Sequence, residues 1–216
     1  MPQDISGYDV GALLYCPANA HHTVAQAVAA ERLPRPFSLA LCLEDTVRAD
    51  ALAAAEQAVE QTLHDLTDAA RQETFYRPLT FVRVRSPEQL ARLGRAYGKY
   101  RPLLTGFILP KFFIETCGAY CAVIRDLQAD GLDYFYMPVF EAPSMLPLHT
   151  RHAALAEVNA LLDALRECIL NIRVGGNDLC HVFGLRRDPG HTIYDLRPVA
   201  DVLTDLLTTF APDYLV

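Results

Sequence analysis

The sequence predicts an α/β fold in which parallel strands alternate with helices, and three observations support this prediction. Short runs of branched and aromatic residues alternate along the chain with longer segments of helical periodicity. Several of the short runs are apolar without interruption, as is typical of strands that are covered on both faces. The composition, with 51% hydrophobic and 21% charged residues in a chain of 216, suffices for one domain with a sizeable core. Strands and helices in strict alternation indicate repeated βαβ units.

Each predicted strand is a short run of mostly apolar residues. The runs are Ala12–Ala18, Ser38–Asp45, Thr80–Ser86, Gly106–Lys111, Asp133–Glu141 and Asn171–Asp178. Periodicity alone does not distinguish an open, doubly wound sheet from a closed barrel. An eight-stranded barrel usually takes about 250 residues, and the last residues, Pro212–Val216, resemble the entry to a seventh strand. We therefore expect residues 1–216 to form a single domain that ends near a seventh strand, either as an incomplete barrel or as a piece of a longer protein.

Between these strands, apolar residues recur with helical spacing. The predicted helices are His22–Arg32, Ala49–Arg71, Pro87–Gly98, Phe113–Gln128, Arg151–Cys168 and Val199–Phe210. The third has a clear start signal, because Ser86 can cap it, proline takes the first helical position and Gln89 follows at the third.

The composition excludes several classes of partner. With 19 Lys and Arg residues and a formal net charge of −7, the chain is not expected to carry a broad nucleic-acid surface. No run approaches the roughly 18 apolar residues of a membrane span, and the first residues lack the basic and apolar regions of a signal peptide. We therefore expect a cytoplasmic protein. Its six cysteines are scattered, and only Cys117 and Cys121 lie close together, so we expect buried reduced thiols rather than a zinc site.

The carboxyl ends of the predicted strands share one feature, because polar side chains interrupt or follow the apolar runs there. These residues are Asn19, Glu44, Asp45, Arg83, Arg85, Lys111, Glu141, Asn177 and Asp178. In a barrel of parallel strands these ends form one face, where active sites are built. Strand alternation also predicts that Arg83 and Arg85 share a face. The alternative is chance placement, since loops commonly begin with polar residues.

Glu141 and Asp178, on separate strands, form a pair suited to a hard divalent cation. Magnesium is commonly held by one or two carboxylates, while waters and substrate oxygens complete its octahedron. Gly175 and Gly176 would allow the backbone to approach the metal or the substrate closely. From these residues alone, two structural roles remain open: Glu141 can cap a turn before Pro143, and Asp178 can cap a helix.

Taken together, the motifs resemble the citrate lyase beta-subunit family and its relatives among aldolases and malyl thioester lyases. The matching blocks run in the family's order from Leu13 to Asp178. They are Leu14-Tyr15-Cys16-Pro17-Ala18-Asn19, Leu43-Glu44-Asp45-Thr46-Val47, Phe81-Val82-Arg83-Val84, Gly106-Phe107-Ile108-Leu109-Pro110-Lys111, Val139-Phe140-Glu141 and Gly175-Gly176-Asn177-Asp178-Leu179. The second block, similar to a Leu-Glu-Asp-Ala-Val signature, is the most specific.

The resemblance implies a TIM-type (β/α)8 barrel that cleaves a carbon–carbon bond beside a carbonyl group with the help of Mg²⁺. By position, Glu141 and Asp178 would be the metal ligands, and Arg83 would hold the substrate carbonyl or carboxylate, for which its planar fork is suited. Glu44 and Asp45 would line the pocket as proton-transfer groups or as acceptors for ordered water. They can also simply cap the next helix.

The resemblance further implies a small anionic substrate, either an oxo acid or a coenzyme A thioester, and a homo-oligomer. Asn19, Arg83, Arg85, Lys111 and the backbone at Gly176 are the expected substrate-binding positions. Lys111 has a second interpretation, in which it pairs with a carboxylate and does not contact substrate.

The sequence departs from the family pattern at three places. Cys42 stands where the family has an acidic residue, Arg85 replaces an asparagine, and Ala20-His21-His22 replaces an early arginine. The last change puts coenzyme A binding in doubt. The departures are similar to those of a divergent branch found in bacterial biosynthetic clusters associated with stress and tellurite resistance. Two alternatives follow: a barrel that lost its chemistry and serves as a subunit or scaffold, or one that catalyses another enolate reaction.

Overall fold

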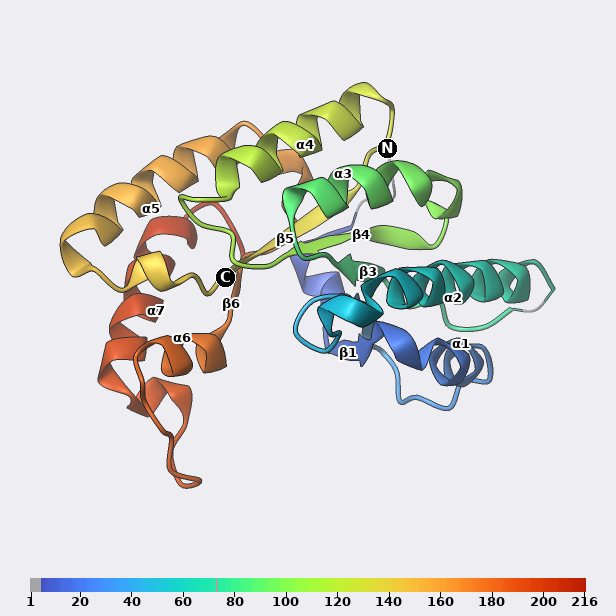
Figure 1. Ribbon diagram of the computed structural model, residues 1–216, viewed down its shortest axis with the longest axis horizontal. Coiled ribbons are helices and arrows are strands. Elements are labelled where there is room, and N and C mark those ends of the chain that lie inside the picture. Colours follow the sequence, from blue (N-terminus) through green and yellow to red (C-terminus); the bar gives the residue numbers. More distant parts are fainter. Residues whose placement is uncertain (1–4, 73) are drawn as a thin grey trace.

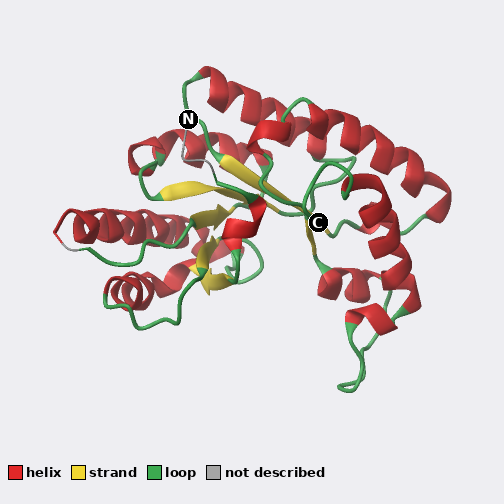
Figure 2. Cartoon of the chain, turned by 180° about the vertical axis from the view of Figure 1, so that it is seen from behind, coloured by secondary structure: helices red, strands yellow, loops and turns green. Residues whose placement is uncertain are grey.

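The structure of the chain is a computed structural model, which describes residues 5–72 and 74–216. It is an α/β fold in which helices surround a curled sheet (Figures 1 and 2). Helices contact each other around the outside of the sheet: α1 with α2, α3 with α4, α4 with α5, and α5 with α7. No helix in the described ranges is long and apolar enough to cross a membrane.

Strands and helices alternate as the sequence predicts. The strands are β1 (Leu13–Pro17), β2 (Ser38–Cys42), β3 (Thr80–Arg83), β4 (Leu104–Leu109), β5 (Phe135–Phe140) and β6 (Arg173–Val174). The α-helices are α1 (His21–Ala29), α2 (Leu52–Gln72), α3 (Pro87–Ala96), α4 (Cys117–Ala129), α5 (Leu148–Asp163), α6 (Gly176–Val182) and α7 (Arg197–Phe210). Short 3₁₀ helices lie at Gly7–Val10, Ala18–Ala20, Ala49–Ala51, Gly98–Tyr100, Pro143–Met145, Arg166–Cys168 and Ile193–Asp195.

The strand order decides between the two architectures that periodicity left open. The described strands form one sheet in the order β1-β2-β3-β4-β5-β6, and every neighbouring pair is parallel. A doubly wound sheet reverses its order at a switch point, whereas a barrel adds each strand beside the previous one. The order in this chain is therefore that of a barrel, and the sheet curls accordingly (Figure 1).

The two faces of the sheet bury different cores. The outer core lies between the sheet and the helices, and Leu41, Val82 and Phe107 contribute to it. Among the described residues, a smaller inner core contains none from an α-helix. Its buried members are Val10, Ala40, Phe81, Ile108, Met137, Val139 and Leu170. Because side chains alternate along a strand, the inward positions that follow Phe81 and Val139 are Arg83 and Glu141, at the open end of the curled sheet.

The last predicted strand is shorter than expected. Asn171–Asp178 was predicted as one strand, but only Arg173–Val174 is extended, and α6 begins at Gly176. Asp178 therefore lies in the first turn of a helix that sequence periodicity did not reveal. Pro212–Val216 forms no strand, although the Leu215 carbonyl accepts a hydrogen bond from the Ile172 amide at 2.7 Å.

The predicted start of α3 is confirmed, with a difference in detail. The Ser86 hydroxyl accepts a hydrogen bond from the Gln89 amide, and Pro87 takes the first helical position. The Gln89 side chain does not complete a capping box, because it accepts from the Arg85 amide at 2.7 Å and donates to Glu56 at 2.6 Å. All six cysteines are free thiols, and five of them are buried.

Candidate active site

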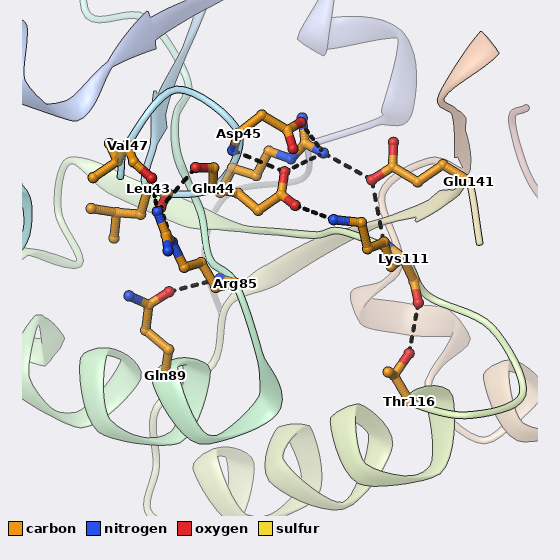
Figure 3. Close-up of polar contacts among 10 residues, drawn as sticks. Leu43, Glu44, Asp45, Val47, Arg85, Gln89, Lys111, Thr116 and Glu141 are labelled. Carbon is orange, nitrogen blue, oxygen red and sulfur yellow. Dashed lines mark hydrogen bonds and ion pairs between the residues drawn. The ribbon is translucent and has the colours of Figure 1, made fainter. Parts of the chain in front are cut away.

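Arg83, at the end of β3, is the centre of a cluster of charged side chains at the carboxyl ends of four strands. Figure 3 shows its neighbours Glu44, Asp45, Lys111 and Glu141. Arg83 Nη2 lies 2.8 Å from Glu141 Oε1, 2.9 Å from Glu44 Oε2 and 3.2 Å from Asp45 Oδ2. The Arg83 side chain is only 11% exposed, and its buried Nε has no hydrogen-bond partner in the part of the chain that the structure describes. One nitrogen of the guanidinium, Nη2, thus contacts three carboxylates, while Nε donates to none of the described residues.

Lys111 follows β4 and connects two of these carboxylates. Its Nζ lies 2.6 Å from Glu44 Oε1, and its amide donates to Glu141 Oε1 at 3.3 Å. The residue has a φ of 50°, in the left-handed region that side chains other than glycine rarely occupy. The Thr116 hydroxyl donates to its carbonyl at 2.7 Å and supports this backbone conformation. Of the two interpretations of Lys111, the structure shows the pairing with a carboxylate.

Glu141 and Asp178 meet around Gly175, which precedes α6. A Cβ atom placed on Gly175 would lie 2.2 Å from Glu141 Oε2 and 3.1 Å from Asp178 Oδ2. The two carboxylate oxygens therefore face the same small volume, which any side chain at position 175 would enter. The two carboxylate oxygens of Glu141 have different neighbours. Oε1 accepts hydrogen bonds from Arg83 and Lys111, and Oε2 faces Asp178.

Burial and charge shift the proton affinities of the cluster. Burial raises the pKa of Glu141 to about 7, and the negative charges of Asp178 and Glu44 add to the rise against the opposing effect of Arg83. Burial likewise raises the pKa of Glu44, with a further contribution from Asp45 and opposition from Lys111 and Arg83. Burial alone would lower the pKa of Arg83, but the surrounding carboxylates raise it, so the guanidinium remains charged.

The donor set fits one divalent cation. Three carboxylates, those of Glu44, Asp45 and Glu141, contact Arg83, and Lys111 pairs with Glu44. The carboxylate of Asp178 lies beside Glu141 and adds a further negative charge. No group of three or more His, Cys, Asp or Glu side chains within the described ranges is arranged to hold a metal. A metal held by Glu141 and Asp178 would thus take its other ligands from water and substrate, as magnesium commonly does.

Arg85 lies apart from this cluster and binds backbone. Its Nε donates to the Leu43 carbonyl at 2.6 Å, and its Nη2 donates to the carbonyls of Glu44 and Val47. The expectation that Arg83 and Arg85 share a face stays a prediction, but the two side chains have different partners: Arg83 binds carboxylates, and Arg85 binds backbone carbonyls. The guanidinium of Arg85 instead holds the loop that carries Glu44 and Asp45 (Figure 3). Its predicted contact with substrate stays a prediction.

Three other expected positions lie outside the charged cluster. Asn19 is exposed after β1 and lines a shallow cavity of about 360 Å³ with the first turns of α2. Gly176 is buried against the Ile193 side chain, which a Cβ atom would approach to 2.6 Å. The side chains of Ala20, His21 and His22 lie outside the part of the chain that the structure describes.

Sequence reasoning did not single out Tyr15 on β1, which is 39% exposed, or Arg173 on β6, which is half-buried. The Arg83 guanidinium carbon lies 6.0 Å from the centre of the Tyr15 ring, and Arg173 interacts with the Tyr15 hydroxyl. The available signal for Tyr15 was alternation, since it is two residues from Leu13, which packs against the inner core.

Comparison with known proteins identifies the family. The family described as C-C bond lyase of the TIM-barrel fold matches residues 4–216. None of the curated proteins matches the chain.

Several solved structures share the fold. The citrate lyase beta subunit of M. tuberculosis, complexed with oxaloacetate and magnesium, is 20% identical with a TM-score of 0.57 and matches 95% of this chain and 77% of its own. The protein CitE of Mycobacterium tuberculosis, in complex with magnesium and acetate, is 22% identical with a TM-score of 0.55 over 92% of this chain and 69% of its own. RipC from Yersinia pestis is 14% identical with a TM-score of 0.55 over 96% and 74%. The fold class that the resemblance implied is thereby confirmed.

Proposed function

Because the chain belongs to the family of carbon–carbon bond lyases with the TIM-barrel fold, we propose that it is a magnesium-dependent lyase that cleaves an oxo acid or an acyl thioester beside a carbonyl group. The observation that carries this proposal is the meeting of Glu141 Oε2 and Asp178 Oδ2 around Gly175. These two carboxylates would hold the metal. A bound Mg²⁺ would act as a Lewis acid that polarises a substrate oxygen.

The remaining side chains have separate tasks in this proposal. Arg83 is fixed by three carboxylates, and its guanidinium would hold the carbonyl or carboxylate of the substrate. Glu44 and Asp45 position Arg83 and are the groups available to exchange a proton with substrate. Lys111 neutralises Glu44 at 2.6 Å and fixes the orientation of its carboxylate.

Titration of MgCl₂ into the protein by calorimetry, with and without pyruvate, tests the metal site. We expect pyruvate to strengthen magnesium binding, and we expect Glu141→Gln and Asp178→Asn to abolish it, because each removes one anionic ligand. Asp201→Asn, an exposed position on α7, is the matched control and should bind normally. Normal magnesium binding by both site variants would contradict the assignment.

Deuterium exchange at the methyl group of pyruvate, followed by proton NMR in D₂O, tests the chemistry. A lyase of this class must remove a proton from the carbon beside the carbonyl, or return one to it. The protein with MgCl₂ should therefore exchange the methyl protons faster than MgCl₂ alone. Magnesium binding without exchange of pyruvate, and without cleavage of any oxo acid or thioester, would favour the scaffold role instead.

Three finer statements remain predictions. They are the cytoplasmic location, the homo-oligomeric state and the use of a coenzyme A thioester. The first two rest on composition and on resemblance, and the third is weakened by the absence of an arginine at positions 20–22.

A further inference from the structure

We propose that Arg85 is a positioning residue, which acts on the candidate site through the loop of residues 43–47 and does not contact substrate. This loop carries Glu44 and Asp45, the two acidic groups beside Arg83. The inference rests on the proposed function for the tasks of these two side chains. It goes further by assigning to Arg85 an effect on turnover rather than on substrate affinity.

The hydrogen bonds of the Arg85 side chain all go to the backbone of this loop (Figure 3). Its Nε donates to the Leu43 carbonyl at 2.6 Å, and its Nη2 donates to the carbonyls of Glu44 and Val47. Among the described residues, no Asp or Glu forms an ion pair with Arg85 at 4.0 Å or less. Because hydrogen bonds from a charged donor are stronger than neutral ones, this half-buried guanidinium holds the loop from its first residue to its last.

The loop has few other bonds that would fix it. It connects the end of β2 to the 3₁₀ helix at Ala49–Ala51 and contains no helix or strand. Within it, the Val47 amide donates to the Glu44 carbonyl at 3.1 Å, and the Asp45 amide donates to Glu44 Oε2 at 3.0 Å. Because Glu44 and Asp45 are neighbours in the chain, a shift of this backbone would move both carboxylates away from Arg83 at once.

The same hydrogen bonds leave Arg85 poorly placed to bind substrate. A guanidinium binds a carboxylate with two parallel donors, either Nε with Nη2 or Nη1 with Nη2. Both pairs include Nη2, which already donates to two carbonyls of the loop. The residue therefore supports the groups that face substrate from behind.

Arg85 is itself anchored to the helices that cover the sheet. Its amide donates to Gln89 Oε1 at 2.7 Å, and Gln89 Nε2 donates to Glu56 Oε1 at 2.6 Å. Gln89 belongs to α3 and is 6% exposed, and Glu56 belongs to α2. The position of the loop is thus referred to two packed helices, which are more rigid than the loop itself.

The kinetics of exchange at the pyruvate methyl group, in D₂O with MgCl₂, test the proposal. Arg85→Gln should lower kcat about tenfold to a hundredfold, because small displacements of catalytic groups are costly, and should leave the KM for pyruvate within about twofold. Arg85→Lys keeps the charge and one donor group and should recover part of the loss. Arg95→Gln, which removes an exposed arginine of α3 paired with Asp130, is the charge-matched control. Unchanged kcat in Arg85→Gln, or a higher KM at unchanged kcat, would overturn the proposal.

Hydrogen exchange of the magnesium-free protein separates this inference from the proposed function. Peptides that cover residues 43–47 should exchange faster in Arg85→Gln than in the unmodified protein, while those of β5 stay the same. Faster exchange of the loop in a protein that does not turn over pyruvate would count against the lyase alone. Equal exchange of the loop in both proteins overturns the positioning role. Should Arg85→Gln fail to fold, Arg85→Lys replaces it in both measurements, with a smaller effect in the same direction.

Discussion

At the scale of one residue, the candidate site needs glycine at position 175, because any larger side chain would collide with Glu141. The φ of Gly175, −84°, is ordinary for any residue, so the requirement for glycine is one of space. An added methyl group would lie 2.6 Å from Glu141 Cβ and 2.2 Å from its Oε2. Because the buried Glu141 side chain is held by Arg83 and Lys111, it has little freedom to move away.

We predict that Gly175→Ala abolishes magnesium binding and lowers the free energy of unfolding by about 1–3 kcal/mol, as overpacking commonly does. Gly118→Ala is the matched control, because no atom of the described residues lies within 4 Å of a Cβ atom at that helical position. It should stabilise the protein by up to about 1 kcal/mol. Calorimetry with MgCl₂ and urea denaturation provide both readouts. Unchanged magnesium affinity in Gly175→Ala would show that Glu141 Oε2 is not a ligand.

The sequence predicts those residues of the candidate site that lie at the carboxyl ends of strands. Glu44, Arg83, Lys111 and Glu141 converge in the structure because the ends of parallel strands meet. Arg85 differs because its guanidinium binds backbone carbonyls of the loop after β2, and sequence periodicity does not predict the conformation of that loop.

At the scale of elements, Glu56 joins α2 to α3. Its Oε1 accepts from Gln89 and from Arg92, each at 2.6 Å, and its side chain is 13% exposed. Burial alone would raise the pKa of Glu56, but the hydrogen bonds from Arg92 and Gln89 outweigh it and lower the pKa below the ordinary value of 4.5. Because Gln89 also accepts from the Arg85 amide, this contact extends to the loop that carries Glu44.

A lowered pKa in the folded state means that Glu56 stabilises the protein above pH 4.5 and that this contribution is lost as the pH falls below that value. We predict that Glu56→Gln lowers the free energy of unfolding at pH 7 by about 1–2 kcal/mol, and that this difference shrinks in acid. Urea denaturation at pH 7 and at pH 3.5 measures it. Glu60→Gln, which removes an exposed pair with Lys99, should change little. A Glu56→Gln difference that persists at pH 3.5 would contradict the assignment.

The elements themselves differ in how much local sequence determines them. The helix at Pro87 is specified by its own cap, and α2 by a long apolar periodicity, so both could be predicted. The segment Gly175–Val182 could not, because its glycines and short length favour a turn, and α6 is fixed by packing of Leu179 and Cys180 against the core.

At the scale of the whole molecule, the order of the strands predicts how stability is distributed. β2 to β5 have a hydrogen-bonded neighbour on both sides, whereas β1 and β6 have one within the described chain. β6 contains two residues, so few hydrogen bonds hold its amides in the sheet. Local opening is easiest where backbone hydrogen bonds and buried contacts are fewest.

We predict that hydrogen exchange is slowest in β3 and β4 and fastest in β6 and α6, and that MgCl₂ with pyruvate slows exchange selectively from Arg173 to Asp178. Magnesium and pyruvate bound by Asp178 and Glu141 would connect α6 to the end of β5. The segment that contains β6 could then open only after these ligands dissociate. Mass spectrometry of peptides after exchange at two protein concentrations measures this. If β6 is as protected as β3 without ligand, and this protection is lost on dilution, a second copy covers the β6 edge and the predicted homo-oligomer accounts for it. If the protection is independent of concentration and of ligand, β6 is stabilised within the chain, and the coupling of Asp178 to the strand ends is wrong.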